Sequence, residues 1–286
     1  MKPPPLRWVR PASIAECVAQ LAELGEDAKI IAGGQSLMPL LALRMAAPSV
    51  LIDLDRLTEL DHVTPREGHV YLGALVRHRR LTADPAVAAA CGLLPSAARH
   101  IGHPAIRNRG TLGGSLAHAD PAAELPALMV ALRAELICVS ATAGRRNLPA
   151  SEFFTGPYST ALAQDELLAA VRLPLPGPGT RYGFCEVSAR PGDFARAGCA
   201  CVLDLDPAGV IQDASTVLFA VSGAPVDVSR AAAGLRGLPA AEVDWRSVAA
   251  QLADTAELAA TAAYTRRLAR TVLRRAMTQA ASGVTA

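Results

Sequence analysis

Two glycine pairs, each close to a serine, constrain this chain more than any other feature of its sequence. The first pair lies in Ala32-Gly-Gly-Gln-Ser36 and the second in Thr111-Leu-Gly-Gly-Ser115. Glycine adopts positive φ readily and lets a backbone come close to another group, which suits phosphate oxygens held by backbone N–H groups. Two such segments predict two N–H cradles that converge on one polyanionic ligand, with a diphosphate as the natural candidate. Taken singly, each segment is also compatible with an ordinary tight turn.

The spacing within both segments argues against the common nucleotide-binding motifs. Neither fits the G-x-G-x-x-G of a dinucleotide-binding domain or the G-x-x-x-x-G-K-[ST] of a phosphate loop. A Rossmann domain and a nucleotide hydrolase are therefore not supported. The hydroxyls of Ser36, Thr111 and Ser115 are the expected side-chain donors, with little need for Lys or Arg.

The composition predicts a compact protein without a membrane span. The chain has 286 residues, 51% of them hydrophobic and 19% charged, which suits one or two domains with a large core. No apolar run approaches the roughly 20 residues that cross a bilayer, and the first residues resemble neither a signal peptide nor a transit helix. A cytoplasmic location is expected on these grounds. A net charge of +2 and an aromatic content of 4% argue against nucleic-acid binding.

Hydrophobic periodicity indicates a mixture of helices and strands in two parts. Ser13-Ile-Ala-Glu16 has the capping-box pattern and opens a helix that Gly25 ends. The proline- and glycine-rich residues 174–179 form the best domain boundary, and three helices are expected at the end of the chain, the last from about 257 to 280. The other expected elements are strands at 29–32, 50–53, 70–74, 136–139, 167–173, 182–188, 197–205 and 215–221, and helices at 37–44, 85–91, 94–100 and 122–133.

The reactive residue types form neither a metal site nor a catalytic site in the sequence. No C-x-x-C pair occurs among the six cysteines, and Cys199 and Cys201 have the period-two spacing of a strand core. His100, His103 and His118 fall within 19 residues, but their spacing fits no zinc pattern. No Ser/His/Asp set or carboxylate pair emerges, so no catalytic residue is assigned. Any metal centre is expected on another chain.

Several neighbours of the second glycine pair have an expected role near the ligand. Asp120-Pro121 is typical of the N-cap and first position of a helix that carries Glu124, with ligand contact by Asp120 as the alternative. Arg107 and Arg109 precede the pair and are candidates either for phosphate contact or for surface salt bridges. His118 is expected to form a hydrogen bond near the ligand.

Four segments, taken in their order along the chain, resemble a single family. They are Ala32–Ser36, Arg107–Ser115, Ala119–Pro121 and Gly192–Ala195. In order and spacing they resemble the FAD-binding medium subunit of molybdenum hydroxylases, the family of bacterial carbon monoxide dehydrogenase and of the flavin domain of xanthine dehydrogenase. The resemblance implies an α+β fold. A two-lobed FAD-binding domain of the flavin-dehydrogenase, vanillyl-alcohol-oxidase-like type would span 1–175, with its lobes divided near 55–60, and a smaller C-terminal domain of antiparallel strands and helices would span 180–286.

The resemblance also implies which residues bind FAD. The two glycine segments would hold the pyrophosphate and the ribityl chain. Glu124 would lie near the adenosine half, Ile101 would pack on the flavin, and the backbone of Leu168 would meet the ring system. The full implied set is Ala32, Gly33, Gly34, Gln35, Ser36, Ile101, Thr111, Leu112, Gly113, Gly114, Ser115, Glu124, Leu168 and Glu186.

Two positions depart from the family pattern. The position of Glu186 often holds a lysine that contacts the flavin ring, and the position of Gln35 often holds a histidine. A cation beside the N1/O2 edge of the ring would stabilise the reduced anion, whereas a carboxylate would disfavour it. Glu186 is therefore expected to point away from the ring, to pair with Arg190 or to lower the flavin potential. Both departures argue against carbon monoxide as the substrate.

The function that the resemblance implies is electron transfer through FAD. The chain would take electrons from a [2Fe-2S] small subunit and pass them to a quinone, NAD or oxygen, while hydroxylation would take place on a molybdopterin-binding large subunit. The three subunits would form a dimer of heterotrimers, in the cytoplasm or peripherally at the inner face of the membrane. The alternatives are a stand-alone flavin oxidoreductase that acts directly on an organic substrate and a flavin-free scaffold.

Overall fold

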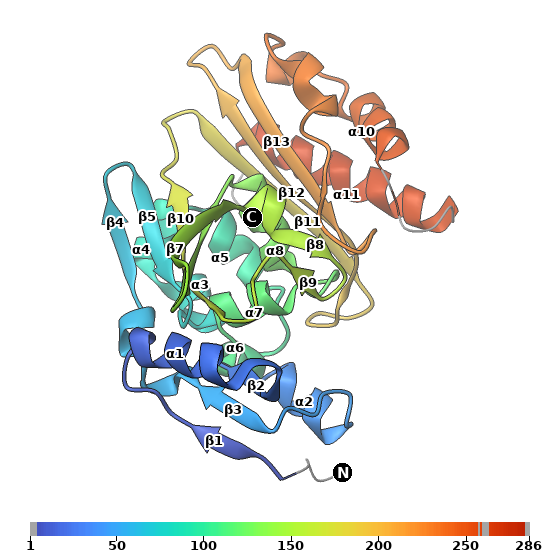
Figure 1. Cartoon of the computed structure of the whole chain (residues 1–286). Helices are drawn as coiled ribbons and strands as arrows, with labels where there is room; N and C mark the ends of the chain where they lie inside the picture. The colour runs from blue at the N-terminus through green and yellow to red at the C-terminus, as the bar shows by residue number, and fades with distance from the viewer. Residues whose placement is uncertain (1–4, 257, 259–262, 284–286) are drawn as a thin grey trace.

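The computed structural model describes residues 5–256, 258 and 263–283, and its three main sheets follow one another from the N-terminal to the C-terminal end of the molecule (Figure 1). The first sheet is parallel, and the second and third are antiparallel. This mixture of helices and sheets confirms the predicted α+β class.

The first sheet has the strand order β1-β3-β2. Its elements are β1 (Arg7–Val9), α1 (Ile14–Leu24), a 3-10 turn η1 (Gly25–Asp27), β2 (Ala28–Ile31), α2 (Leu37–Ala42), β3 (Val50–Asp53), η2 (Leu54–Arg56) and η3 (Thr58–Leu60). Ser13 begins α1 because its Oγ accepts the Glu16 N–H at 3.1 Å, and Gly25 ends the helix at a φ of +53°. The first glycine pair directly follows β2, so it lies at the carboxyl edge of this sheet, between a strand and a helix as predicted.

The second sheet has the order β4-β5-β10-β6-β7. Its strands are β4 (Val63–Arg66), β5 (His69–Gly73), β6 (Glu135–Ser140), β7 (Gly144–Pro149) and β10 (Glu166–Pro174). Between them the chain forms α3 (His78–Ala83), α4 (Pro85–Ala90), α5 (Leu93–Ala98), α6 (Pro104–Arg109), α7 (Leu112–His118), α8 (Glu124–Ala131), α9 (Ala150–Phe153) and the ribbon of β8 (Phe154–Gly156) with β9 (Ser159–Thr160). The central strand β10 bulges at Ala169, whose carbonyl accepts the Ala74 N–H at 2.9 Å and so fixes the chain after β5.

The third sheet has the order β11-β12-β13-β14 and carries the last helices on its outer face (Figure 1). Its elements are β11 (Thr180–Ser188), β12 (Ala195–Leu205), β13 (Ile211–Phe219), β14 (Val226–Asp227), η4 (Ala231–Leu235), η5 (Ala240–Glu242), α10 (Trp245–Thr255) and α11 (Ala263–Ser282). A Cβ at Gly183 would stand 1.8 Å from the Ala276 carbonyl oxygen, so the absence of a side chain lets α11 pack directly on β11.

Successive side chains along the strands of the third sheet point alternately into two different hydrophobic cores. Ala200 faces the main core, which fills the space between the second sheet, α5, α7 and α8. Cys199 and Cys201 face the opposite way, into the core beneath α10 and α11, and both are fully buried. The prediction of a strand core for these two cysteines is confirmed. Within the described ranges no helix is long and apolar enough to cross a membrane.

Three local expectations are corrected, and a fourth falls outside the described residues. The second glycine pair does not form a turn, because Gly113 and Gly114 lie inside the first turn of α7, behind Thr111 as N-cap. Helix α8 begins at Glu124 and its N-cap is Ala123, while Asp120 closes a separate turn by accepting the Ala122 N–H at 2.9 Å. Two α-helices and two 3-10 segments follow the third sheet in the described part of the chain, where three helices were expected. The expected start of the last helix, near 257, falls outside the described residues.

Candidate functional site

The two glycine segments, distant in sequence, lie against each other. A Cβ at Gly33 would stand 2.4 Å from the Arg109 carbonyl oxygen and 2.9 Å from the Gly110 Cα. A Cβ at Gly114 would stand 3.7 Å from the Ala32 Cβ. The backbones therefore approach as closely as glycine allows, and the predicted convergence of the two segments is confirmed.

The first segment presents a set of backbone N–H groups that have no acceptor in the chain. Among the described residues, no oxygen accepts the N–H groups of residues 33–36, whereas the carbonyls of Gly34 and Ser36 accept from Met38 and Leu40 at 3.1 and 3.3 Å. Gly34 has a φ of +71°, which turns the chain between β2 and α2. Successive N–H groups left free in this way form an anion-binding nest, and we call residues 33–36 the N–H nest.

The second segment is different, because its N–H groups already have acceptors. Leu112 and Gly113 donate to the carbonyls of Val76 and Ala74 at 2.9 and 2.8 Å, and Gly114 donates to the Thr111 Oγ1 at 3.1 Å. The Ser115 N–H closes the first turn of α7 on the Thr111 carbonyl. The expectation of a second N–H cradle is therefore wrong for this structure. The segment can offer the Ser115 hydroxyl and a surface without side chains.

His78 forms a hydrogen bond to the second segment, a contact that the sequence did not predict. Its Nε2 lies 3.0 Å from the Thr111 carbonyl oxygen, so the neutral ring donates from Nε2. Its Nδ1 is buried and has no hydrogen-bond partner among the described residues. Burial lowers the pKa of His78 to about 4. His78 is therefore a neutral donor that holds the N-cap of α7 in place.

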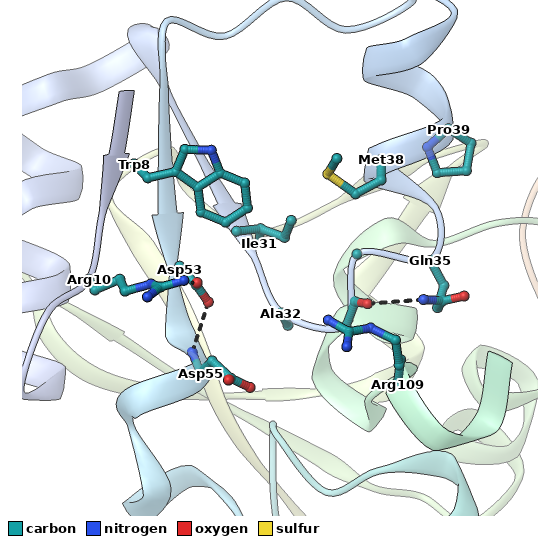
Figure 2. Close-up of a pocket in the computed structure, with 12 residues that line it drawn as sticks. Trp8, Arg10, Ile31, Ala32, Gln35, Met38, Pro39, Asp53, Asp55 and Arg109 are labelled. Atoms are coloured by element: carbon teal, nitrogen blue, oxygen red, sulfur yellow. Dashed lines mark hydrogen bonds and ion pairs between the residues drawn. The ribbon is translucent and has the colours of Figure 1, made fainter. Parts of the chain in front are cut away.

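A pocket of about 450 Å³ opens at the carboxyl edge of the first sheet (Figure 2). Residues 33–35 of the N–H nest form one wall, and Figure 2 shows Trp8 and Met38 on the side of the pocket away from Arg109. Asp53 and Asp55, which follow β3, line it as well. Open α/β sheets bind ligands at this edge, where strands end and backbone groups are free. Trp8 and the two aspartates carry no motif that would have identified them in the sequence.

The two arginines before the second segment have separate roles. Arg109 lines the pocket beside the N–H nest. Arg107 instead donates to the carbonyls of Ile101 and Gly102, at 3.1 and 2.6 Å. It fixes the loop after α5 and forms no salt bridge with any of the described residues.

Ile101, Glu124 and Glu186 form a second group of the residues implied by the resemblance, around the loop that carries Ile101. This loop packs against the segment Gly192–Ala195, since a Cβ at Gly192 would stand 2.9 Å from the His103 ring. Nearby, the buried side chain of Glu186 has its Oε2 3.9 Å from the His100 Nδ1. Three of the four family-like segments therefore meet either at the nest or close to this group.

Glu124 and Glu186, for which the resemblance implies separate roles, lie close together. Burial raises the pKa of Glu124 to about 7 and that of Glu186 to about 8, and the carboxyl of Glu124 also contributes to the shift at Glu186. Glu124 therefore shares the environment of Glu186, and its expected place near the adenosine half of FAD stays a prediction. Glu186 forms no ion pair with Arg190 among the described residues.

The remaining candidates stand apart from the nest. Leu168 lies in β10 with its side chain in the main core, 4% exposed, so only its backbone is available for a ligand. His118 packs against the Tyr158 ring at a centroid distance of 5.1 Å, and the Tyr158 hydroxyl donates to Asp120 at 3.4 Å. The expected hydrogen bond of His118 near the ligand stays a prediction, because a ring–ring contact leaves both ring nitrogens available.

The arrangement fits a flavin dinucleotide. The N–H nest supplies uncharged hydrogen-bond donors. A Cβ at either Gly33 or Gly114 would fill the space between the two segments. A diphosphate needs such donors and such space.

Comparison with known proteins gives the family directly. Residues 4–176 match the FAD binding domain in molybdopterin dehydrogenase, and residues 182–280 match the CO dehydrogenase flavoprotein C-terminal domain. The chain is 36% identical to the caffeine dehydrogenase subunit beta of a Pseudomonas species, over 99% of this chain and 97% of that protein.

Solved structures agree over the whole chain. Quinoline 2-oxidoreductase from Pseudomonas putida 86 contains a chain with a TM-score of 0.92 and 37% identity, covering 100% of both chains. A reconstituted CO dehydrogenase from Oligotropha carboxidovorans gives a TM-score of 0.94 at 32% identity, covering 99% of this chain and 100% of the other. The chain therefore belongs to the FAD-binding medium subunits of the molybdenum hydroxylases, and it is an FAD-dependent oxidoreductase subunit.

Proposed function

We propose that this chain transfers electrons from a [2Fe-2S] small subunit to an external acceptor, a quinone, NAD or oxygen. When bound, FAD accepts single electrons and releases them in pairs, so the protein has to hold it, orient it and set its potential. Hydroxylation would then occur on the molybdopterin-binding large subunit. The observation that carries this proposal is the N–H nest beside Gly113 and Gly114, a set of free backbone donors that suits an anion.

In this proposal the N–H nest binds the diphosphate of FAD. Backbone N–H groups donate to the phosphate oxygens without the flexibility of a long side chain, so the dinucleotide is held in one orientation. Gly33 and Gly114 keep the space open, and Ser115 donates its hydroxyl from the opposite side. Gln35 is held over the nest because its Nε2 donates to the Gly33 carbonyl at 3.3 Å.

The flavin ring would lie at the other group of implied residues. Ile101 offers an apolar side chain that is partly buried against the main core, and Glu186 and Glu124 offer the only nearby carboxyls among the residues implied by the resemblance. The backbone of Leu168 is the remaining contact in the implied set. This placement gives the ring a negative or proton-bearing neighbour where relatives of the family often have a lysine.

The proposed assembly is a dimer of heterotrimers with a molybdopterin-binding and an iron–sulfur subunit. The relatives named as medium subunits and medium chains support it. Within this chain we propose that the FAD-binding domain spans 1–175, with its lobes divided near 55–60, and that the C-terminal domain spans 180–286. A cytoplasmic location, free or at the inner face of the membrane, is part of the same proposal.

Anaerobic reduction of the purified chain tests this function against a stand-alone flavin enzyme. The chain loaded with FAD should stay oxidised with organic substrates and become reduced only by a reduced [2Fe-2S] protein or by the complete complex with its substrate. Tagged chain purified from its native cells should bring along molybdenum and iron in fixed ratios. Reduction of the isolated chain by an organic substrate alone would refute the electron-transfer proposal.

A further inference from the structure

Two buried carboxyl groups meet on the inner face of the third sheet. Glu186 lies on β11, with its side chain 2% exposed, and Glu124 is the first residue of α8, 7% exposed. Residues alternate along a strand, so Glu186 shares its face of β11 with Phe184, which packs into the main core. The two carboxyls are therefore removed from solvent in the same place.

The hydrogen bonding of this pair is incomplete unless a proton is present. Ionised carboxylates only accept hydrogen bonds, so neither can donate to the other. The Glu186 Oε2 is buried and has no hydrogen-bond partner among the described residues, although Glu124 lies within hydrogen-bonding reach of Glu186. A single proton shared by the two carboxyls supplies the missing donor.

The charged groups around the two carboxyls do not replace this shared proton. Within the described residues the charges that act on the pair are negative, namely Glu124 on Glu186 and Asp120 on Glu124, while Glu186 acts on Glu124 as a hydrogen-bond partner. The neighbour Cys185 points to the opposite face of β11, where Arg275 from α11 acts on its thiol. Burial lowers the pKa of His100, so this ring is mainly neutral near pH 7. No cation in this part of the structure takes the place of the proton.

We propose that Glu124 and Glu186 together bind one proton and that His100 exchanges this proton with solvent. Two adjacent carboxyls in a low-dielectric site do not both ionise, because each destabilises the charge on the other. The pair is then a single site with one proton, and the negative charge belongs to both groups.

His100 connects the buried pair to water. Its Nδ1 lies 3.9 Å from the Glu186 Oε2 and its side chain is 46% exposed, while its ring packs at 5.1 Å from the Phe184 ring. The separation exceeds a hydrogen bond, so a single bridging water or a small rotation of the ring completes the path. The proton passes from the Glu186 carboxyl to Nδ1, and the ring releases the proton on Nε2 to solvent. Reprotonation runs in the opposite direction, so no proton is gained or lost overall.

A consequence for the cofactor rests on the proposed function. If the flavin ring lies beside Glu186, the shared proton offsets the negative charge that the ring gains on reduction. The midpoint potential of the bound flavin should then change its pH dependence where the pair titrates. The proton site itself does not depend on this placement.

Infrared spectroscopy of the full chain tests the proton site without FAD. Wild-type protein should retain a carboxylic-acid carbonyl band near pH 7, and Glu124→Gln/Glu186→Gln should lack it. Glu186→Gln alone should keep the band only to lower pH, because the remaining Glu124 carboxyl has a pKa of about 7, below the value of about 8 for Glu186 beside it. Glu152→Gln, at an exposed glutamate, is the matched control and should match wild type. An absent band in wild type, or a band retained in the double variant, would overturn the proposal.

The role of His100 and the placement of the flavin have their own readouts. His100→Phe keeps an aromatic ring against Phe184, so the titration midpoint should stay while the response of the band to a pH jump slows about tenfold or more, with rescue by free imidazole. An unchanged rate refutes the role of His100. In FAD-loaded protein, a flavin potential whose pH slope is the same in wild type and in the double variant would leave the proton site intact and refute the placement of the ring beside it.

Discussion

Replacing Gly33 with alanine should separate the two glycine segments and weaken FAD binding. The new Cβ would stand 2.4 Å from the Arg109 carbonyl oxygen, against 3.4 Å for an ordinary contact, and that neighbour is backbone. The segments must therefore move apart by roughly 1 Å, which costs about 1–3 kcal/mol of folding free energy. Gly33 has no positive φ, so the effect comes from the collision alone.

The same displacement sets the expected loss of affinity. Phosphate hydrogen bonds from backbone N–H groups work at about 2.7–3.2 Å, so a shift of roughly 1 Å breaks those made by the displaced part of the nest. Each such bond to a charged group contributes about 1.5–3 kcal/mol, and losing two weakens FAD binding by about 100-fold or more.

Fluorescence titration of the apo-chain with FAD and with riboflavin checks this prediction. Riboflavin lacks the diphosphate, so its affinity should change far less than that of FAD. Gly234→Ala is the matched control, because Gly234 has no heavy atom within 4 Å of the added Cβ and no positive φ. Thermal unfolding shows whether the Gly33→Ala protein is folded. An FAD affinity within about threefold of wild type in folded Gly33→Ala protein would refute the role of the nest.

Three further predictions concern the second segment and the carboxyl pair. Gly114→Val places a Cβ 2.7 Å from the Thr111 Oγ1, so it should displace the N-cap at a cost of about 1 kcal/mol and leave purified protein without FAD, and normal flavin absorbance would contradict this. The stability that Glu124 contributes is present below its unfolded pKa of 4.5 and is lost as pH rises through its folded pKa of about 7. Between these pH values the free energy of unfolding in urea should therefore change by about 3 kcal/mol less in Glu124→Gln than in wild type. An equally steep pH dependence in the variant would count against the burial of this carboxyl. Glu186→Lys would place a cation where the family often has one and should raise the flavin midpoint potential by about 30–60 mV in a redox titration, whereas an unchanged potential would mean that residue 186 does not face the ring.

Local signals in the sequence predicted the strand and the helix that flank the N–H nest. The strand before Gly33 and the helix after Ser36 follow from apolar runs and from the turn chemistry between them. The burial of Cys199 and Cys201 follows from period-two spacing alone. These features depend on neighbours along the chain, which is why one sequence suffices to predict them.

The actual use of the second segment could not be predicted in the same way. Whether the N–H groups of Leu112 and Gly113 are free depends on where the carbonyls of Val76 and Ala74 lie, and those belong to a distant strand end. His78 reaches the Thr111 carbonyl through the same tertiary arrangement. Donor groups that look equivalent in two similar motifs therefore differ once the sheet has formed.

The contact between Glu124 and Glu186 also could not be predicted from local sequence signals. Glu124 begins α8 and Glu186 lies on β11 of the third sheet, so only packing brings them together. The family pattern indicated that Glu186 is unusual, but it gave no reason to expect a second carboxyl as its partner.

A crystal structure of the chain with FAD bound tests the central claim most directly. The account predicts the diphosphate oxygens at about 2.7–3.2 Å from backbone N–H groups of residues 33–36, with the Ser115 hydroxyl on the opposite side and the N–H groups of Leu112 and Gly113 still donating to Val76 and Ala74. A diphosphate bound elsewhere, with the N–H groups of residues 33–36 facing solvent, would contradict it.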